Sequence, residues 1–286
     1  MKVLLIGANG QLGHALYHTR PDDVKILLCD YPKIDFVSDS SIRNCVERYN
    51  VDWVINAAAY TAVDKAENEP ELANRINRDA VETLSLICKK KSVRLVHIST
   101  DFVFSGANFK PWLPKDNPDP VSIYGSSKLE GENAVKDILG NRALIIRTAW
   151  LYSSHGTNFV KTMLDLMTSN EKLNVVDDQI GTPTWATGLA STVWKLIKMK
   201  LGGMYHWTDA GIASWYDFAV AVQEEALNLG LLEKEIPILP ISTDSFPRPA
   251  KRPHYSVLDK RKTWDKTKCE PMHWRKHLRM MLRELV

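Results

Sequence analysis

The chain has 286 residues, 44% of them hydrophobic and 25% charged, so it is long enough for a substantial core and for one large or two moderate domains. Its 37 basic and 34 acidic residues leave a net charge of +3, which predicts no polyanionic partner. No apolar run approaches membrane-spanning length, and the first residues resemble a strand rather than a signal peptide. We therefore expect a cytoplasmic protein with no membrane or nucleic-acid partner.

The four cysteines do not have the spacing of metal ligands. They are Cys29, Cys45, Cys88 and Cys269, and two of them, Cys29 and Cys88, lie inside apolar runs. In a cytosolic protein this pattern favours reduced, buried thiols.

The first element in chain order is an apolar run over residues 2–8, followed by a glycine-rich turn and a helical pattern over residues 14–20. The turn contains Gly7, Gly10 and Gly13, with Gln11 and Leu12 between the last two. A strand, a glycine turn and a helix form the start of a dinucleotide-binding unit, in which the helix N-terminus receives the pyrophosphate. The pattern predicts an NADH or NADPH site.

A second apolar run, residues 24–30, ends in an acid. Asp30 stands where this fold places the carboxylate that hydrogen-bonds the adenosine ribose, which favours NADH because the charge repels a 2′-phosphate. Lys33 is close enough in sequence to offset that repulsion, so NADPH stays open. The alternative is that Asp30 is only a turn residue.

A helix is expected over residues 40–49, a third strand over 51–59 and a long helix over 70–90. Three alanines close the third strand before Tyr60 and Thr61, and small residues there would let a flat cofactor approach the backbone. Asn56 and Thr61 could hold its polar groups. Tight strand–helix packing is the other explanation for the alanines.

The fourth strand, residues 93–100, ends in Thr100 and Asp101, and the fifth spans residues 143–150. Carboxyl ends of strands carry the site in open α/β sheets. Beyond residue 150 the alternation of strands and helices loosens. We therefore predict an α/β fold: a Rossmann-type doubly wound parallel sheet over 1–150, with part of 173–200 returning to it, and a smaller α/β substrate-binding domain over 151–286.

Tyr124 and Lys128 are four residues apart and so share one face of a helix. A phenol has a pKa of about 10, and a nearby ammonium favours the phenolate, so this spacing predicts a proton-transfer pair in which Lys128 lowers the pKa of Tyr124. Such spacings also occur by chance on surface helices. The preceding glycine turn and the Thr100 strand end favour the catalytic interpretation.

The last 40 residues, 247–286, hold twelve Lys and Arg against four Asp and Glu. Nucleic-acid binding is one explanation. A charged outer helix face, with one or two arginines turned toward a substrate diphosphate, is the simpler one.

Together these motifs resemble those of the extended short-chain dehydrogenase/reductases, and within them the dTDP-4-dehydrorhamnose reductase family. The similarity covers nearly the whole chain and includes three further segments: Arg147-Thr148-Ala149-Trp150, Asp178-Gln179-x-Gly181-x-Pro183-Thr184 and Arg252-Pro253-x-x-Ser256-x-Leu258. It implies reduction of the C4 ketone of a dTDP-linked 6-deoxyhexulose by NADH or NADPH.

The resemblance also implies roles for single residues. Tyr124 would donate the proton, Lys128 would support it and hold the nicotinamide ribose, and Thr100 would hydrogen-bond the carbonyl oxygen. The residues implied in substrate binding are Thr100, Asp101, Trp150, Lys161 and Arg252. Those implied in cofactor binding are Gly7, Gly10, Gln11, Leu12, Gly13, Asp30, Asp35, Phe36, Ala58, Ala59, Tyr60, Thr61, Tyr124 and Lys128.

The chain departs from the family at one place. Some members dimerise around a magnesium ion held by three glutamates, whose places here are taken by Ala15, Thr187 and Glu284. A hard cation needs carboxylates, so we expect no metal site, and a monomer or weak homodimer.

Two other functions remain open. One is another nucleotide-sugar enzyme of the same fold, an epimerase or a dehydratase that retains and recycles NAD. The other is a non-catalytic NAD(P)-binding module similar to the regulatory subunit of methionine adenosyltransferase.

Overall fold

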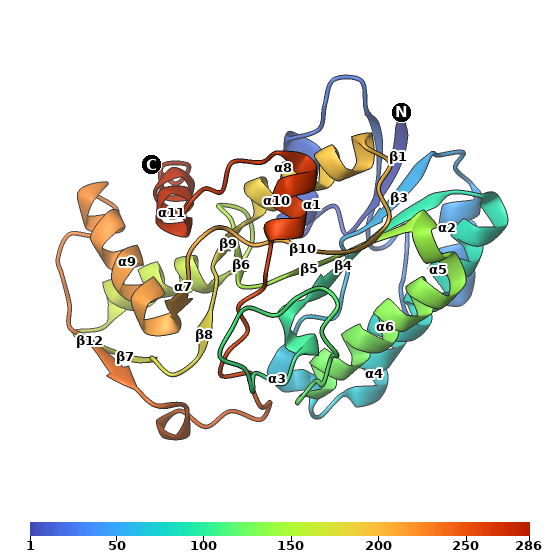
Figure 1. Cartoon of the computed structure of the whole chain (residues 1–286). Helices are drawn as coiled ribbons and strands as arrows, with labels where there is room; N and C mark the ends of the chain where they lie inside the picture. Colours follow the sequence, from blue (N-terminus) through green and yellow to red (C-terminus); the bar gives the residue numbers. More distant parts are fainter.

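A computed structural model describes all residues 1–286, and a six-stranded parallel sheet organises it (Figure 1). The strand order is β2-β1-β3-β4-β5-β10. The chain moves outward from β1 to β2 and then returns to the other side of β1 with β3. This reversal is the topological switch point, at which open α/β sheets bind their ligands.

The sheet strands are short and lie in register with their neighbours. Their bounds are β1 Lys2–Ile6, β2 Lys25–Cys29, β3 Trp53–Asn56, β4 Arg94–Thr100, β5 Ala143–Thr148 and β10 Gly203–His206. The helices that pack on them are α1 Gln11–His18, α2 Asp39–Glu47, α5 Ala80–Lys91, α6 Ile123–Leu139 and α8 Ala186–Lys198. Short helices α3 Val63–Ala66 and α4 Pro70–Asn74 lie before α5.

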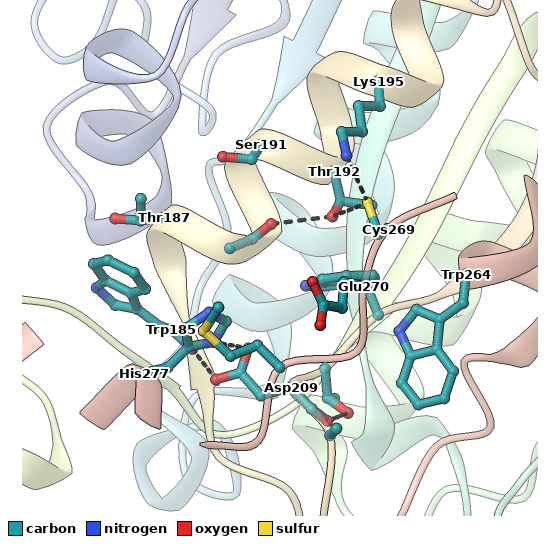
Figure 2. A pocket seen from close by; sticks show the side chains of 15 residues that line it. Trp185, Thr187, Ser191, Thr192, Lys195, Asp209, Trp264, Cys269, Glu270 and His277 are labelled. Atoms are coloured by element: carbon teal, nitrogen blue, oxygen red, sulfur yellow. Dashed lines mark hydrogen bonds and ion pairs between the residues drawn. The ribbon is translucent and has the colours of Figure 1, made fainter. Parts of the chain in front are cut away.

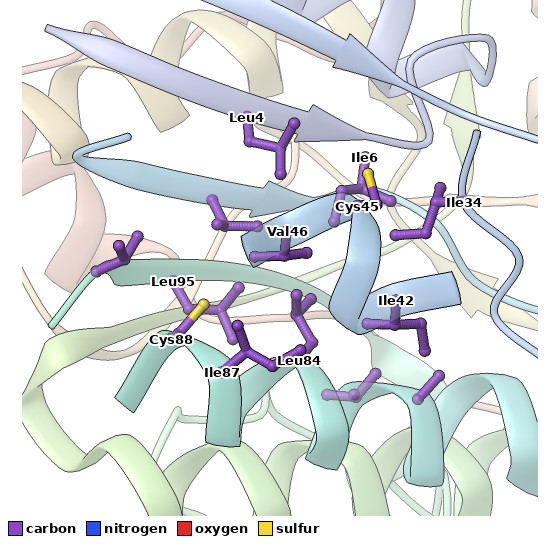
Figure 3. Packing of buried hydrophobic residues seen from close by; sticks show 14 of the residues in the cluster. Leu4, Ile6, Ile34, Ile42, Cys45, Val46, Leu84, Ile87, Cys88 and Leu95 are labelled. Carbon is purple, nitrogen blue, oxygen red and sulfur yellow. The ribbon is translucent and has the colours of Figure 1, made fainter. Parts of the chain in front are cut away.

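Successive residues of each strand enter opposite cores, as the two-residue period of a strand requires. On β1, Leu4 and Ile6 pack with α2, α5 and α6, where Ile42 and Leu84 are fully buried (Figure 3). Val3 and Leu5 pack on the other face with α1 and α8. The sheet is therefore buried on both faces, which explains its continuous apolar runs.

A third core lies outside the sheet and is built by the C-terminal part of the chain. Its helices are α7 Phe159–Ser169, α9 Trp215–Asn228 and α11 Trp274–Leu282, and its strands pair as β7 Leu173–Val176 with β12 Ile238–Ile241. Two shorter pairs, β6 Leu151–Tyr152 with β9 Thr184–Trp185 and β8 Ile180–Gly181 with β11 Ala213–Ser214, connect it to the sheet edge. Helix α10, Arg261–Thr267, lies beside β10.

The chain returns to the sheet within its second half, through α8 and β10. Helix α8 packs against α1, and β10 extends the sheet beyond β5. The returning segment therefore extends to residue 206, somewhat farther than the sequence suggested. The division into domains near residue 150 stays a prediction.

Two element boundaries differ from those expected. The first helix begins at Gln11, directly after the N-cap Gly10, and ends at His18. The long helix over 70–90 is α4 and α5 joined by a π-helical turn, Arg75–Asp79. Helix α9 begins with a capping box, in which the Ser214 hydroxyl accepts from Asp217 N and the Asp217 carboxylate accepts from Ser214 N.

The cysteines are arranged differently from the expectation of four separate thiols. The sulfurs of Cys29 and Cys45 lie against each other as a candidate disulfide pair, while Cys88 and Cys269 are free. The Cα atoms of the pair are 7.8 Å apart, beyond the usual span of a disulfide. Reduced thiols therefore stay a prediction.

Candidate active site

The glycine turn after β1 is packed so closely that side chains are excluded. Gly7 has a φ of +79°, and a Cβ there would lie 2.6 Å from the Ala58 amide nitrogen. A Cβ at Gly13 would lie 2.0 Å from the Gly7 carbonyl oxygen. The turn therefore presents bare backbone and the open N-terminus of α1, whose Gly10 cap has no side chain to occupy it. These features fit a pyrophosphate.

Asp30 follows β2 and lies beside that turn. Its carboxylate accepts from Asn9 N at 2.8 Å and from Tyr31 N at 2.9 Å. Farther along the connection, Asp35 accepts from Val37 N, and Phe36 is buried in the core below. The predicted ribose carboxylate is thus fixed next to the phosphate turn by backbone donors.

The segment after β3 is held by a side-chain network from two helices. Asn77, on the π-helical turn, accepts from Tyr60 N at 2.9 Å and donates to Tyr60 O at 3.1 Å. It also donates to Ser127 Oγ on α6 at 3.0 Å. This network fixes the chain from Ala58 to Thr61 next to the switch point, and π-helical turns occur often at functional sites.

Tyr124 and Lys128 lie on one face of α6 and are both buried, at 9% and 2% exposure. Burial raises the pKa of Tyr124 to about 12, and the Asp101 charge adds to this, while a hydrogen bond with Thr100 opposes it. Burial lowers the pKa of Lys128 to about 8, opposed by Glu132. Lys128 Nζ donates to Ile98 O at 2.7 Å.

The expected lowering of the Tyr124 pKa by Lys128 is therefore absent from this structure. Desolvation of the phenolate outweighs every other influence, and the ammonium is engaged with a backbone carbonyl. Tyr124 is a protonated phenol here, which is the form that an acid needs.

Thr100 and Asp101 lie at the carboxyl end of β4, where Thr100 has become the cap of a 3₁₀ turn, Asp101–Val103. Thr100 Oγ1 accepts from Phe102 N at 3.2 Å and donates to Asp101 Oδ1 at 3.1 Å. The Phe102 ring packs edge-on to the Tyr124 ring at 5.6 Å. The predicted hydroxyl, acid and phenol are thus brought together by β4 and α6.

Trp150 follows β5 at the same edge of the sheet. It has a φ of +47°, unusual for a bulky residue, and its ring stacks on Trp215 with centroids 3.5 Å apart. Lys161 lies on α7, with Nζ 3.4 Å from Ser154 O. Trp150 packs against the C-terminal core, and the role of both residues in substrate binding stays a prediction.

Arg252 forms a salt bridge with Asp64, a partner that the sequence did not suggest. Its two terminal nitrogens donate to the two carboxylate oxygens of Asp64 at 3.0 and 2.9 Å. The Arg252 guanidinium holds the pKa of Asp64 below its usual value, although burial opposes this. This fork joins the segment after β3 to the segment before α10, two borders of the site.

Two cavities lie away from Tyr124. One, of about 220 Å³, is bounded by α8, α11 and the segment after α10, and includes Lys195, Asp209, Cys269 and His277 (Figure 2). We place the candidate site at Tyr124 nevertheless, because the glycine turn, the strand ends and the buried polar residues meet there.

A second hollow, of about 280 Å³, brings together the three positions that the family resemblance associates with a magnesium site. Ala15, Thr187 and Glu284 all line it, with His14 and His18. Glu284 accepts from Ser154 Oγ at 2.5 Å. No group of three or more His, Cys, Asp or Glu side chains in the chain is placed to hold a metal ion. None of the helices is both long and apolar enough to cross a membrane.

Sequence reasoning assigned no role to several residues that support the site. Arg147 and Ser256 appeared only as members of family segments, and Asp64, Glu67, Asn77, Ser127 and Glu132 were given no function. Glu67 accepts from Ile123 N at 2.8 Å and so caps α6. The only sequence signal for this role was the position of Glu67 in a polar run after β3. That position indicates a capping role only once α6 is known to begin beside it.

The strand order, the glycine turn and the Tyr–Lys pair on α6 together define the fold and site arrangement of an extended short-chain dehydrogenase/reductase. The model of the RmlD substrate binding domain family matches residues 1–286. The chain belongs to this family, that of the dTDP-4-dehydrorhamnose reductases.

Individual relatives agree over their full length. A dTDP-4-dehydrorhamnose reductase of Escherichia coli (strain K12) is 36% identical over 294 residues, covering 100% of this chain and 98% of the relative. The spore coat polysaccharide biosynthesis protein SpsK of Bacillus subtilis (strain 168) is 38% identical, with 99% and 97% covered. The crystal structure of the Bacillus anthracis dTDP-4-dehydrorhamnose reductase in complex with NADP has a TM-score of 0.93 at 36% identity, with 99% of both chains covered.

Proposed function

We propose that this chain reduces the C4 ketone of dTDP-4-dehydro-6-deoxy-L-mannose with NADPH or NADH, giving dTDP-L-rhamnose. The observation that carries the proposal is the burial of Tyr124, Lys128 and Thr100 together at the carboxyl edge of the sheet, beside the glycine turn. The names of the full-length relatives support the substrate, and NADP in one of their structures supports the cofactor.

The chain's own residues supply the acid and the binding surface. The nicotinamide cofactor, when bound, supplies a hydride to C4 of the sugar. Tyr124 gives its phenolic proton to the ketone oxygen, so that ketone, hydride and proton become the alcohol. The Lys128 ammonium favours the phenolate left behind, and the Thr100 hydroxyl stabilises the oxygen where negative charge develops.

On the substrate side, we assign Trp150, Lys161 and Arg252 to binding of the nucleotide sugar. Arg252 has the planar fork that binds a diphosphate, and Asp64 occupies that fork in this structure. We infer that the substrate diphosphate takes the place of the Asp64 carboxylate.

The test is turnover of the purified chain with dTDP-4-dehydro-6-deoxy-L-mannose. We expect one NADPH or NADH oxidised for each dTDP-L-rhamnose formed, with the product identified by mass spectrometry and proton NMR. Conversion of the sugar without net cofactor oxidation would indicate an epimerase or dehydratase. Cofactor binding with no sugar conversion would indicate a binding module.

Asp30 tests the cofactor preference. Asp30→Ala should raise kcat/KM for NADPH relative to NADH about 10-fold or less, because it removes a charge beside the adenosine ribose. The measurement is the ratio of the two kcat/KM values, with Asp22→Ala, at an exposed acid before β2, as the control. An equal change for both cofactors would show that Asp30 does not face the 2′ position.

Magnesium should have no effect on this protein. Its hollow offers Glu284 where relatives offer three carboxylates, and magnesium requires near-octahedral oxygen ligands. We expect the same mass by light scattering, and the same turnover, in EDTA and in excess magnesium. A loss in EDTA that magnesium restores would show that other carboxylates bind the ion.

A further inference from the structure

The Thr100 hydroxyl has one proton and more than one acceptor for it. In this structure that proton points to Asp101 Oδ1 at 3.1 Å, while the oxygen accepts from Phe102 N at 3.2 Å. The proposed reduction requires the same proton to be donated to the ketone oxygen. A hydroxyl has one donor and a carboxylate has none, so Thr100 cannot serve an ionised Asp101 and the ketone at once.

Asp101 is a carboxyl group in unusually neutral surroundings. It is 2% exposed, and no donor has good hydrogen-bonding geometry toward its second oxygen, Oδ2. Burial raises the pKa of Asp101 to about 6, opposed by the hydroxyls of Ser256 and Thr100 and by the Asp101 and Phe102 amides. A carboxyl group in this setting changes its protonation near physiological pH.

No cation neutralises Asp101 from the elements around it. On α6, Tyr124 faces it and is uncharged, Lys128 Nζ is engaged by Ile98 O, and Glu132 is paired with Arg147 of β5. From the segment before α10, the neutral Ser256 approaches it, while Arg252 is held by Asp64. The proton on Asp101 is therefore controlled by burial and by hydroxyl groups.

We propose that Asp101 is a positioning residue that sets the direction of the Thr100 proton. The neutral acid donates to Thr100 Oγ1, and Thr100 then donates to the ketone oxygen. The ionised acid takes the Thr100 proton for itself and removes that donor from the reaction. The proposal rests on the reduction proposed above, and it makes neutral Asp101 the competent form.

The consequence is a pH dependence with a definite sign. Turnover is highest where Asp101 is protonated and falls as pH rises through its ionisation. Removing one hydrogen-bond donor to a developing oxyanion typically lowers kcat by about 10²–10³-fold, and we take this as the upper limit for the decrease in kcat at high pH. We expect the high-pH plateau to lie at least about 10-fold below the low-pH plateau.

The experiment is the pH profile of kcat from about pH 5 to about pH 8, with a blank lacking enzyme at each pH because the reduced cofactor decays in acid. The variants are Asp101→Asn, Thr100→Val and Ser256→Ala. Asp101→Asn and Thr100→Val should both lose the ionisation from the profile. Ser256→Ala should keep it but move it to higher pH, because it removes a hydroxyl that favours the carboxylate.

Ser256→Ala is the matched control, since it changes the same pocket and keeps Asp101 and Thr100. A merely structural role for Asp101 would lower activity equally at every pH. The inference is overturned if the Asp101→Asn profile keeps the wild-type ionisation, or if Ser256→Ala leaves it in place. No reduction of the sugar by wild type at any pH would instead overturn the proposed function, and this inference with it.

Discussion

Helix α6 carries two buried charged side chains one turn apart, Lys128 and Glu132. Only one of them has an oppositely charged hydrogen-bonding partner. Glu132 is 2% exposed and receives a two-pronged contact from Arg147, with Nε and Nη2 at 2.8 and 2.6 Å from its oxygens. Lys128 is equally buried but has only the Ile98 carbonyl as a hydrogen-bonding partner. The first arrangement locks strand β5 to the helix, and the second leaves a charge available.

We interpret this difference as one between a structural charge, Glu132, and a proposed functional one, Lys128. The Glu132–Arg147 pair is closed, with the guanidinium also lying over the Phe104 ring at 4.9 Å. The pKa of Lys128 is lowered to about 8 by burial, and the pKa of His97 next to it is lowered by burial and by the Lys128 charge. A buried cation with an altered pKa beside strand ends is typical of an active site.

Tyr124→Phe should give the largest effect on the functional side of this comparison. The ring and its contact with Phe102 remain, while the proton donor is lost, so kcat should fall about 10²–10⁴-fold. Cofactor affinity and thermal stability should stay close to wild type. Near-normal turnover would assign the proton donation to another group.

Arg147→Met should give the largest effect on the structural side. It leaves Glu132 buried without its partner, which typically costs about 3–5 kcal/mol of unfolding free energy. Urea denaturation measures this loss. A decrease of less than about 1 kcal/mol would mean that, in the variant, water reaches Glu132 or the Glu132 carboxyl group is protonated.

Lys128→Met separates the two roles directly. The variant removes a buried charge that forms no salt bridge. Its unfolding free energy should therefore equal or exceed that of wild type, whereas that of Arg147→Met should decrease. Turnover and cofactor affinity should both decrease, because the proposed reaction uses this ammonium, which Ile98 O binds in the present structure, to stabilise the phenolate left when Tyr124 gives up its proton. A stability loss as large as that of Arg147→Met would make Lys128 a structural charge.

The final prediction is a pH dependence of stability. The pKa of Lys128 is about 8 when folded and about 10.4 when unfolded, so between these values the unfolded chain binds more protons. The contribution of Lys128 to the unfolding free energy therefore rises with pH from about 8 to about 10.4. The difference between the stability–pH curves of wild type and Lys128→Met isolates this contribution of Lys128. Lys260, whose pKa is also lowered to about 8, is present in both proteins and cancels. Parallel pH curves would contradict the burial of the charge.

The local elements could be predicted from the sequence because local physics determines them. The apolar run before Gly7, the exclusion of side chains at Gly13 and the capping pair Ser214 and Asp217 all depend on neighbours in the chain. Thr100, Tyr124 and Lys128 were found from their motifs, and the fold then placed them together.

The features that the sequence could not predict depend mainly on contacts between residues far apart in the chain. Arg252 and Asp64 are 188 positions apart, so nothing in the sequence shows that the predicted diphosphate ligand has an internal partner. The direction of the Tyr124 pKa was wrong because a pattern gives the spacing of Lys128 but not the depth of burial. The π-helical turn was likewise hidden inside a continuous helical pattern.

That π-helical turn makes the length of the chain at Arg75–Asp79 as important as its composition. A π turn contains more residues than an α turn, and each residue added to an α-helix rotates the remainder of the helix by about 100°. Helix α5 is fixed by its buried Ala80 and Leu84. Deletion of one codon here would therefore turn α4 instead, carrying Ala73 away from Tyr124. Such an in-frame deletion would damage the site while leaving every one of its residues encoded.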